Sequence, residues 1–335
     1  MASRVLVTGA GGFIGGYLAK ALLDLGYEVR CADIKRYGKW WQSWDTDNRI
    51  GDLRDPGLCC LLMRDVDMVF HLASDMGGID YISRHDFSCA SSAAMTVNLL
   101  RAATYAQVST FVFASSACIY PRSLQGLDAE PLVESRVQPV DPEGGYGWEK
   151  LFSEHLCSYA AGLIPNIRVA RLFNVYGPYG AWNDGREKAP AALCRKVALA
   201  SLQGRTDICV NGDGTQTRSF LYIDDCVSGL LSLARSGYDA PVNLASLELV
   251  SIEELALLVG SVAGIRVDLS FDLTAPCGVQ SRVPDTERAL GELGWRAATS
   301  LEHGIRLTYK WINEQLLREL DSDPAGSAVI FAESE

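Results

Sequence analysis

The residues best suited to chemistry in this sequence are a tyrosine and a lysine four positions apart, Tyr146 and Lys150, at the expected start of a helix. Positions i and i+4 share one face of a helix, so the phenol and the ammonium can converge. A nearby cation favours the phenolate, so Lys150 is predicted to lower the Tyr146 pKa. Tyr146 could then take a proton from a hydroxyl while a hydride leaves the adjacent carbon. Ser116 ends an expected strand 30 residues before Tyr146 and would complete this group.

A glycine-rich turn before the first expected helix predicts a dinucleotide cofactor, which would accept the hydride. Gly9, Gly12 and Gly15 have a G-x-x-G-x-x-G spacing, which lets a pyrophosphate approach the backbone above the positive end of a helix. Asp33, 18 residues past Gly15, ends the second expected strand and can accept hydrogen bonds from the adenosine ribose. This pattern favours NAD over NADP, although the basic residues at 35–36 leave NADP open.

A second acidic turn, at 51–53, stands where such folds contact the adenine, with a solvated turn as the alternative for Asp52. Lys150 is also expected to hold the nicotinamide ribose. The cofactor-binding residues predicted from these patterns are Gly9, Gly12, Phe13, Ile14, Gly15, Asp33, Asp52, Leu53, Tyr146 and Lys150.

The order of helices and strands predicts an α/β fold. Short β-branched runs alternate with helical patterns over the first 120 residues, which implies right-handed crossovers and a parallel sheet. Strands are expected at 4–8, 27–32, 68–72, 110–114 and 167–172. Helices are expected at 17–25, 88–96, 95–105 and 149–159. The predicted fold class is a Rossmann-type doubly wound parallel sheet with a smaller C-terminal α/β substrate lobe.

The pattern changes after residue 174, where a Gly/Pro/aromatic-rich loop is expected at 175–185. The elements expected beyond it are helices at 191–202, 224–233 and 252–262, the last capped by Ser251, and a strand at 207–210. The expected division is an NAD-binding domain at 1–173, to which 215–245 returns, a second, smaller lobe at 174–320, and a flexible tail at 321–335.

The composition argues against several classes of protein. Thirty Lys and Arg stand against 41 Asp and Glu in 335 residues, a net charge of −11, which disfavours nucleic acid or an anionic membrane as partner. No apolar run reaches the roughly 18 residues that a bilayer span needs. Ten cysteines without a CxxC pair and four scattered histidines favour neither a disulfide framework nor a metal site. We expect a cytoplasmic location, because no signal-peptide pattern precedes the first strand.

Together these motifs resemble the extended short-chain dehydrogenase/reductase superfamily. The resemblance covers residues 4–315 and rests on TGAGGFIG at 8–15, Asp33, GDL at 51–53, HLA at 71–73, and Ser116, Tyr146 and Lys150. It implies an NAD-binding Rossmann domain, a lobe for a nucleotide sugar, and a homodimer built from two helices of each subunit.

Further stretches are similar to the GDP-mannose 3,5-epimerase family: SDMGG at 74–78, SSACIYP at 115–121, GREKAPAA at 185–192 and GDGTQTRSF at 212–220. The similarity implies oxidation of the hexose at carbon 4, proton exchange at carbons 5 and 3, and re-reduction, which converts GDP-D-mannose to GDP-L-galactose and GDP-L-gulose. It also implies that Cys118 and Lys188 exchange the protons, both with pKa values tuned toward neutrality. The implied catalytic residues are Ser116, Cys118, Tyr146, Lys150 and Lys188.

The same similarity implies the residues that hold the anionic substrate. Lys196 follows Lys188 by about two helical turns on one face. Lys196, Arg218 and Arg282 match positions that hold the diphosphate or the sugar in the family, and arginine suits bidentate contacts to phosphate. Solvated surface charge is the alternative for each. The implied substrate-binding residues are Gly77, Ser116, Cys118, Asn174, Glu187, Lys188, Ala189, Lys196, Gln216, Arg218 and Arg282.

Two departures from the family pattern, Gln280 in place of an arginine and a longer segment at 202–207, leave the base preference and the product open. A 5-epimerase, or an epimerase of another nucleotide sugar, is the nearest alternative. A 4,6-dehydratase would carry Asp-Glu after Ser116, and a 4-epimerase would leave Cys118 and Lys188 idle. A decarboxylating UDP-sugar enzyme is a further rival. A non-catalytic NAD-binding protein is disfavoured because Tyr146 and Lys150 are both present.

Overall fold

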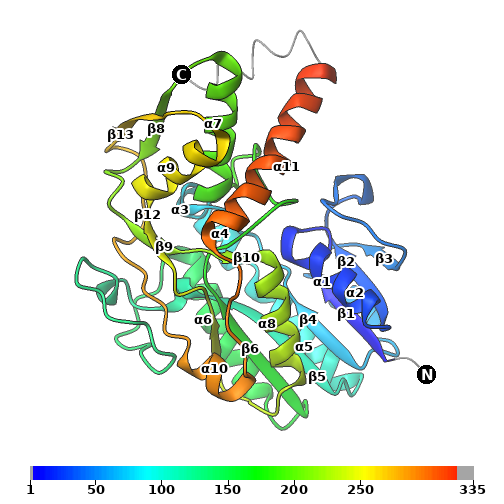
Figure 1. Ribbon diagram of the computed structural model, residues 1–335. Coiled ribbons are helices and arrows are strands. Elements are labelled where there is room, and N and C mark those ends of the chain that lie inside the picture. Colours follow the sequence, from blue (N-terminus) through cyan, green and yellow to red (C-terminus); the bar gives the residue numbers. More distant parts are fainter. Residues whose placement is uncertain (1–2, 323–335) are drawn as a thin grey trace.

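The computed structural model describes residues 3–322, in which helices flank a seven-stranded sheet and a smaller lobe lies over the carboxyl ends of the strands (Figure 1). Every neighbouring pair in the sheet is parallel, as predicted. From one edge to the other the strands are β11 (Val242–Leu244), β6 (Asn166–Leu172), β5 (Thr110–Ser116), β4 (Met68–His71), β1 (Arg4–Thr8), β2 (Glu28–Asp33) and β3 (Asp47–Ile50).

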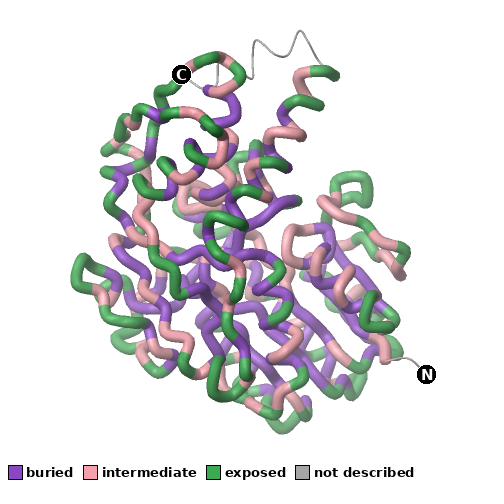
Figure 2. The backbone as a smooth tube through the Cα atoms, viewed as in Figure 1, coloured by how far each residue is buried: buried purple, intermediate pink, exposed green. Residues whose placement is uncertain are grey.

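Both faces of this sheet are buried, which explains the continuous apolar runs of its strands. In β1, Val5 and Val7 pack on one face with Leu18, whereas Leu6 packs on the other with Leu99. Figure 2 shows the buried strands at the centre of this layered arrangement. Helices α1 (Phe13–Asp24) and α8 (Ile223–Arg235) cover the first face, and α2 (Pro56–Leu62), α5 (Ala93–Tyr105) and α6 (Gly144–Ala160) cover the second.

The smaller lobe is built around three helices that pack on one another: α7 (Ala189–Gln203), α9 (Ile252–Ala263) and α11 (Leu301–Ser322). Ser251 caps α9 as predicted, in a reciprocal capping box with Glu254. The short strands pair as β8 (Asp207–Asn211) with β13 (Asp268–Asp272), β9 (Thr217–Ser219) with β12 (Leu249–Ser251), and β7 (Val175–Tyr176) with β10 (Leu221–Tyr222). Helix α10 (Glu287–Leu293) lies near β11.

The structure differs from the sequence expectations in several boundaries. Helix α6 begins at Gly144 rather than near 149, so Tyr146 lies within its first turn. The prediction of a single helix at 88–96 is wrong, because a turn at 91–92 interrupts that range. Helix α4 (Asp86–Ala90) ends before the turn and α5 begins after it, and a further short helix, α3 (Ile79–Arg84), precedes α4. The loop expected at 175–185 contains β7. Of the tail expected at 321–335, residues 321–322 end α11, and the remainder lies outside the described residues.

Within residues 3–322 no helix is both long and apolar enough to cross a membrane. All ten cysteines are free thiols, seven of them buried. The described residues also contain no group of three or more His, Cys, Asp and Glu side chains arranged to hold a metal ion.

Candidate active site

The glycine-rich turn between β1 and α1 requires its glycines. Gly9 has a φ of +72°, a left-handed conformation that favours glycine. A Cβ on Gly15 would collide with the carbonyl oxygen of Gly9, and one on Gly12 would lie 3.0 Å from the same atom. The turn therefore brings the backbone of α1's first turn, with its free N–H groups, to the edge of a cavity.

Asp33, at the end of β2, is fixed beside this turn. One carboxylate oxygen accepts from the Gly11 amide at 2.9 Å and the other from the Lys35 amide at 2.9 Å. Each oxygen keeps a second lone pair for another donor. The Asp52 carboxylate is instead engaged by the guanidinium of Arg54, with a shortest distance of 2.6 Å, which lowers the Asp52 pKa.

Tyr146 and Ser116 meet where β5 ends and α6 begins. Burial raises the pKa of the Tyr146 phenol well above its ordinary value, and a hydrogen bond with Ser116 opposes that rise. The ammonium of Lys150 lies 5.6 Å from the centre of the Tyr146 ring and 3.4 Å from the Glu149 carboxylate. The prediction that the Tyr146 pKa is lowered is therefore wrong, because burial raises it, and Lys150 is paired with a neighbouring carboxylate.

A buried chain of polar groups leads from Glu149 back to the glycine-rich turn. Ser153 donates to Glu149 at 2.9 Å and lies 3.1 Å from the Thr96 hydroxyl. The two ring nitrogens of His71 lie 3.1 Å from Thr96 and 3.0 Å from Thr8. Burial lowers the pKa of His71 to about 3, so its imidazole is neutral. The chain joins β1, β4, α5 and α6 beneath the cavity.

Cys118 follows β5 in a short 3₁₀ turn (Ala117–Ile119), where its amide donates to the Ser116 hydroxyl at 3.2 Å. Burial and then the charge of Glu143 raise the pKa of the Cys118 thiol, and Arg282 opposes them. Arg282 places its guanidinium 3.7 Å from the sulfur and 2.8 Å from the Glu143 carboxylate. The expectation that Cys118 is tuned toward neutrality is therefore wrong: in the structure its pKa rises.

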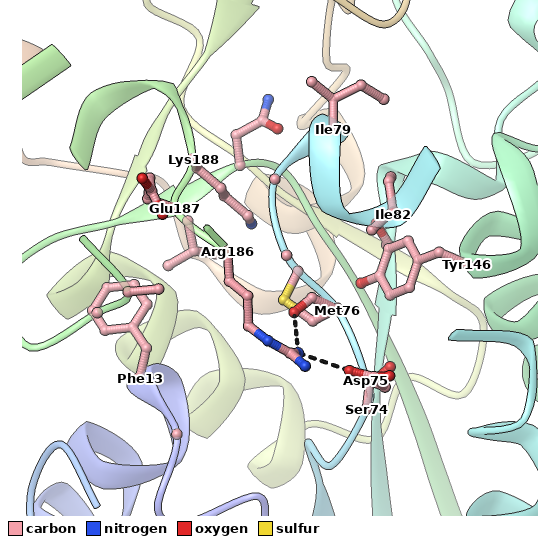
Figure 3. Close-up of a pocket in the computed structure, with 18 of the residues that line it drawn as sticks. Phe13, Ser74, Asp75, Met76, Ile79, Ile82, Tyr146, Arg186, Glu187 and Lys188 are labelled. Carbon is pink, nitrogen blue, oxygen red and sulfur yellow. Dashed lines mark hydrogen bonds and ion pairs between the residues drawn. The ribbon is translucent and has the colours of Figure 1, made fainter. Parts of the chain in front are cut away.

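Lys188 occupies the position that caps α7, and Pro190 stands in the first turn of that helix, as predicted. Burial lowers the pKa of its ammonium, in the predicted direction, although the charge of Cys118 opposes that shift. Figure 3 shows the Lys188 and Tyr146 side chains entering the same space from opposite sides, with Met76 between them. The Gly78 amide donates to the carbonyl of Arg186 at 3.0 Å, which holds this segment against the loop after β4.

The basic residues implied to bind phosphate are already engaged by protein groups. Arg218 donates to the carbonyls of Cys277 at 3.2 Å and Val279 at 2.5 Å, and burial lowers its pKa to about 10. Arg282 also donates to the Gln125 side chain at 2.6 Å. Lys196 donates to the carbonyl of Cys209 at 2.7 Å.

Two other side chains implied to bind substrate keep polar atoms free. One Glu187 oxygen and the Gln216 carbonyl oxygen are buried without a hydrogen-bond partner among the described residues. Asn174, with a φ of +34°, donates to the carbonyl of Ser219 at 3.0 Å.

One cavity of about 970 Å³ brings these positions together. Every residue predicted from the sequence to bind cofactor or substrate, or to act in catalysis, lines this cavity: Gly9, Gly12, Phe13, Ile14, Gly15, Asp33, Asp52, Leu53, Gly77, Ser116, Cys118, Tyr146, Lys150, Asn174, Glu187, Lys188, Ala189, Lys196, Gln216, Arg218 and Arg282. Four further residues line the cavity without having been predicted as site residues: Ser74, Asp75, Glu143 and Arg186. The first two stand in the stretch at 74–78 and Arg186 in the stretch at 185–192, so the motifs could have indicated them; Glu143 carried no such signal.

The sheet, the glycine-rich turn and the tyrosine–lysine pair define a nucleotide-binding epimerase or dehydratase. Residues 5–245 match the model of the NAD dependent epimerase/dehydratase family, and the chain belongs to that family. It is 40% identical over 319 residues to GDP-mannose 3,5-epimerase 1 of Oryza sativa subsp. indica, covering 94% of this chain and 83% of that protein.

Two solved structures show the same architecture. UDP-glucose 4-epimerase from Thermotoga maritima superposes with a TM-score of 0.84 at 22% identity, over 93% of this chain and 99% of that chain. UDP-glucuronic acid 4-epimerase from Bacillus cereus, in complex with UDP-glucuronic acid and NAD, gives a TM-score of 0.78 at 27% identity, over 93% and 99% of the two chains.

The residues of the cavity fit the NAD that this family uses. The first turn of α1 offers free N–H groups for a pyrophosphate, and the Asp33 carboxylate has lone pairs for ribose hydroxyls. The Ser74 hydroxyl is buried in the cavity wall and has no hydrogen-bond partner among the described residues. A dinucleotide would supply partners for all three.

Proposed function

We propose that this protein is an NAD-dependent GDP-mannose 3,5-epimerase. The observation that carries the proposal is the placement of Cys118, Lys188 and Tyr146 around one cavity, where burial shifts the pKa values of the thiol and the amine in opposite directions. Similarity to the rice enzyme over 94% of the chain supports the substrate.

The tyrosine and the serine would act on the hydroxyl at carbon 4. The Tyr146 hydroxyl exchanges a proton with that oxygen, and Ser116 donates a hydrogen bond to it as it becomes a carbonyl. When bound, NAD supplies a hydride acceptor and donor and a positive charge. Lys150 holds the ribose hydroxyls and keeps a cation near the phenol.

The cysteine and the lysine would exchange the protons. A carbonyl at carbon 4 acidifies the hydrogens on carbons 3 and 5, so one group removes a proton and the other returns one from the opposite face. Its lowered pKa suits the Lys188 amine to accept a proton, and its raised pKa suits the Cys118 thiol to donate one. A lowered amine pKa and a raised thiol pKa are the opposite shifts expected of one base and one acid.

The test is incubation of the purified protein with GDP-mannose in D₂O, with products resolved by NMR and mass spectrometry. We expect deuterium at carbons 5 and 3, with galacto- and gulo-configured products. Deuterium at carbon 5 alone would make the protein a 5-epimerase. No incorporation would contradict the substrate assignment.

We also propose a homodimer across α5 and α6. Trp148, Phe152 and Tyr159 lie on one side of α6 and are half-exposed or more, and Tyr105 of α5 is 77% exposed. Two helices with uncovered aromatic side chains suit a second copy of the same surface. Trp148→Lys with Phe152→Lys should give a monomer in analytical ultracentrifugation, whereas Leu127→Lys, on another exposed side chain, should not.

The cysteines bear on the cellular compartment of the protein. Free thiols at all ten cysteines suit a reducing compartment, and we propose the cytoplasm.

A further inference from the structure

Glu143 is a cavity-lining carboxylate that the mechanism above does not use. It stands directly before α6, the helix that carries Tyr146 and Lys150, and its amide donates to the carbonyl of Cys118 at 2.8 Å. Its side chain is 13% exposed and interacts with the Cys118 thiol, whose pKa it raises. Because an ionised carboxylate can only accept, a hydrogen bond between the two runs from the thiol to Glu143.

Arg282 holds this carboxylate in place. Its Nη2 donates to Glu143 at 2.8 Å, its Nε donates to Gln125 at 2.6 Å, and its Nη1 lies 3.7 Å from the Cys118 sulfur. The Arg282 side chain is only 5% exposed, so it has little room to turn toward another anion. Burial would raise the Glu143 pKa, but the charge and hydrogen bond of Arg282 outweigh it and hold the carboxyl ionised.

Several charged and titratable groups face Cys118 from the elements packed around it. Glu143 and Tyr146 come from the start of α6, Lys188 from the start of α7, and Arg218 and Arg282 from β9 and the loop after β13. Among them Glu143 is the carboxylate, and after burial its charge is the largest influence that raises the Cys118 pKa. Arg282 lowers it, so the two residues act on the thiol with opposite signs.

We propose that Glu143 is a positioning residue for proton exchange: it receives the hydrogen bond of the Cys118 thiol and keeps that thiol in its proton-donating form, while Arg282 clamps the carboxylate rather than binding phosphate. When the Cys118 thiol gives its proton to the substrate carbon, a C–H bond forms and a thiolate remains. Lys188, which has taken a proton from the opposite face, then carries the ammonium. The proton count of the pair is unchanged, and the hydride step is not involved. The inference rests on the proposed epimerisation.

The first test measures the thiol without any sugar nucleotide. Alkylation of Cys118 by iodoacetamide is followed from pH 6 to 10 by peptide mass spectrometry. The alkylation rate rises with pH, and its midpoint reports the ionisation of the thiol. Glu143→Gln should move this midpoint down by about one pH unit, because a like charge is removed, and Arg282→Gln should move it up. Glu134→Gln, which disrupts a buried pair with Arg288 outside the cavity, should leave it unchanged. Glu143→Asp keeps the charge and should stay near the wild-type midpoint.

The second test measures deuterium incorporation from D₂O into GDP-mannose. Glu143→Gln should slow incorporation at least tenfold through kcat, with KM and the rate of NADH formation close to wild type. An unchanged midpoint in Glu143→Gln, or equal shifts of the same sign in Glu143→Gln and Arg282→Gln, would overturn the proposal. Wild-type incorporation by Glu143→Gln would overturn it as well. If GDP-mannose is not the substrate, the wild-type protein itself will incorporate no deuterium. The alkylation test needs no substrate and would still decide the role of Glu143.

Discussion

Arg186 and Asp75, 111 positions apart in the chain, form a guanidinium–carboxylate pair with a distance of 2.7 Å. The same guanidinium lies 3.9 Å from the centre of the Tyr81 ring and donates to the Tyr81 hydroxyl. These contacts fasten the segment before α7 to the loop after β4 (Figure 3). Lys188 stands two residues beyond Arg186, so the pair holds the backbone from which the Lys188 side chain extends into the cavity.

Arg186→Ala should therefore impair activity more than stability. The pair is partly exposed and contributes little to folding, whereas a displaced Lys188 should lower kcat by about tenfold or more. Steady-state kinetics and a thermal unfolding curve test this together. Asp75→Asn can still accept a hydrogen bond and should lose less activity. Wild-type kcat in Arg186→Ala would show that the pair does not position Lys188.

Cys118→Ala should abolish deuterium incorporation from D₂O and leave NAD bound. The thiol lines the cavity and packs in a cluster with Ile82, Cys89 and Tyr146, none of which belongs to the glycine-rich turn. Cofactor content after gel filtration and product NMR are the two measurements. Rapid epimerisation by this variant would reduce Cys118 to a packing residue.

Lys150→Ala should instead impair the hydride step. It removes the cation near Tyr146 and leaves Glu149 buried without its partner. Stopped-flow absorbance of NADH should show formation slowed about 100-fold, and the free energy of unfolding should fall by about 3 kcal/mol. Lys150→Arg keeps the charge and should retain more stability. An unchanged rate of NADH formation would contradict the role of Lys150.

His71 should make the folded protein less stable in mild acid. Its pKa is lowered to about 3 by burial and by Lys150, against an ordinary value of about 6.5. Between these values the unfolded chain binds a proton that the folded protein excludes, so stability present above pH 6.5 is lost as the pH falls, by up to about 1.4 kcal/mol per pH unit. Urea unfolding at several pH values measures this slope. His71→Gln should flatten it by one proton, whereas the exposed His303→Gln should not.

Gly15→Ala should disrupt the cofactor site. The added Cβ would collide with the Gly9 carbonyl and with Ala10, so the turn must open and NAD affinity should fall more than tenfold. Isothermal titration measures the affinity. Gly38→Ala is the matched control, because its Cβ meets no atom within 4 Å. Equal NAD binding by both variants would show that the turn tolerates a side chain.

The features that could be predicted from the sequence are those that depend on residues close together in the chain. Gly9, Gly15 and Asp33 flank predicted strands, so their convergence follows from the parallel order of β1 and β2. The start of α6 was missed because Gly144 and Gly145 have low helix propensity. In the structure the chain passes close to Asp86 at these positions, where glycine is required by space.

Contacts between distant segments could not be predicted. Arg282 and Glu143 are 139 positions apart, and nothing local to either residue indicates the other. The family resemblance implied that Arg282 holds the diphosphate or the sugar, and it carried no sign of the contact with Glu143. The predicted direction of the Cys118 pKa shift was wrong for the same reason. That direction depends on burial and on Glu143, which are properties of the tertiary structure.

The buried chain from Thr8 through His71, Thr96 and Ser153 to Glu149 restricts how this fold can be altered. Each member hydrogen-bonds with its neighbours in the chain, and removing one of them orphans a buried polar group at a cost of about 1–3 kcal/mol. The residues come from four elements and are coupled through their hydrogen bonds, so a substitution at one of them calls for a matching change at its neighbours. A protein engineer who grafts this cofactor half onto another lobe should transfer the whole set together.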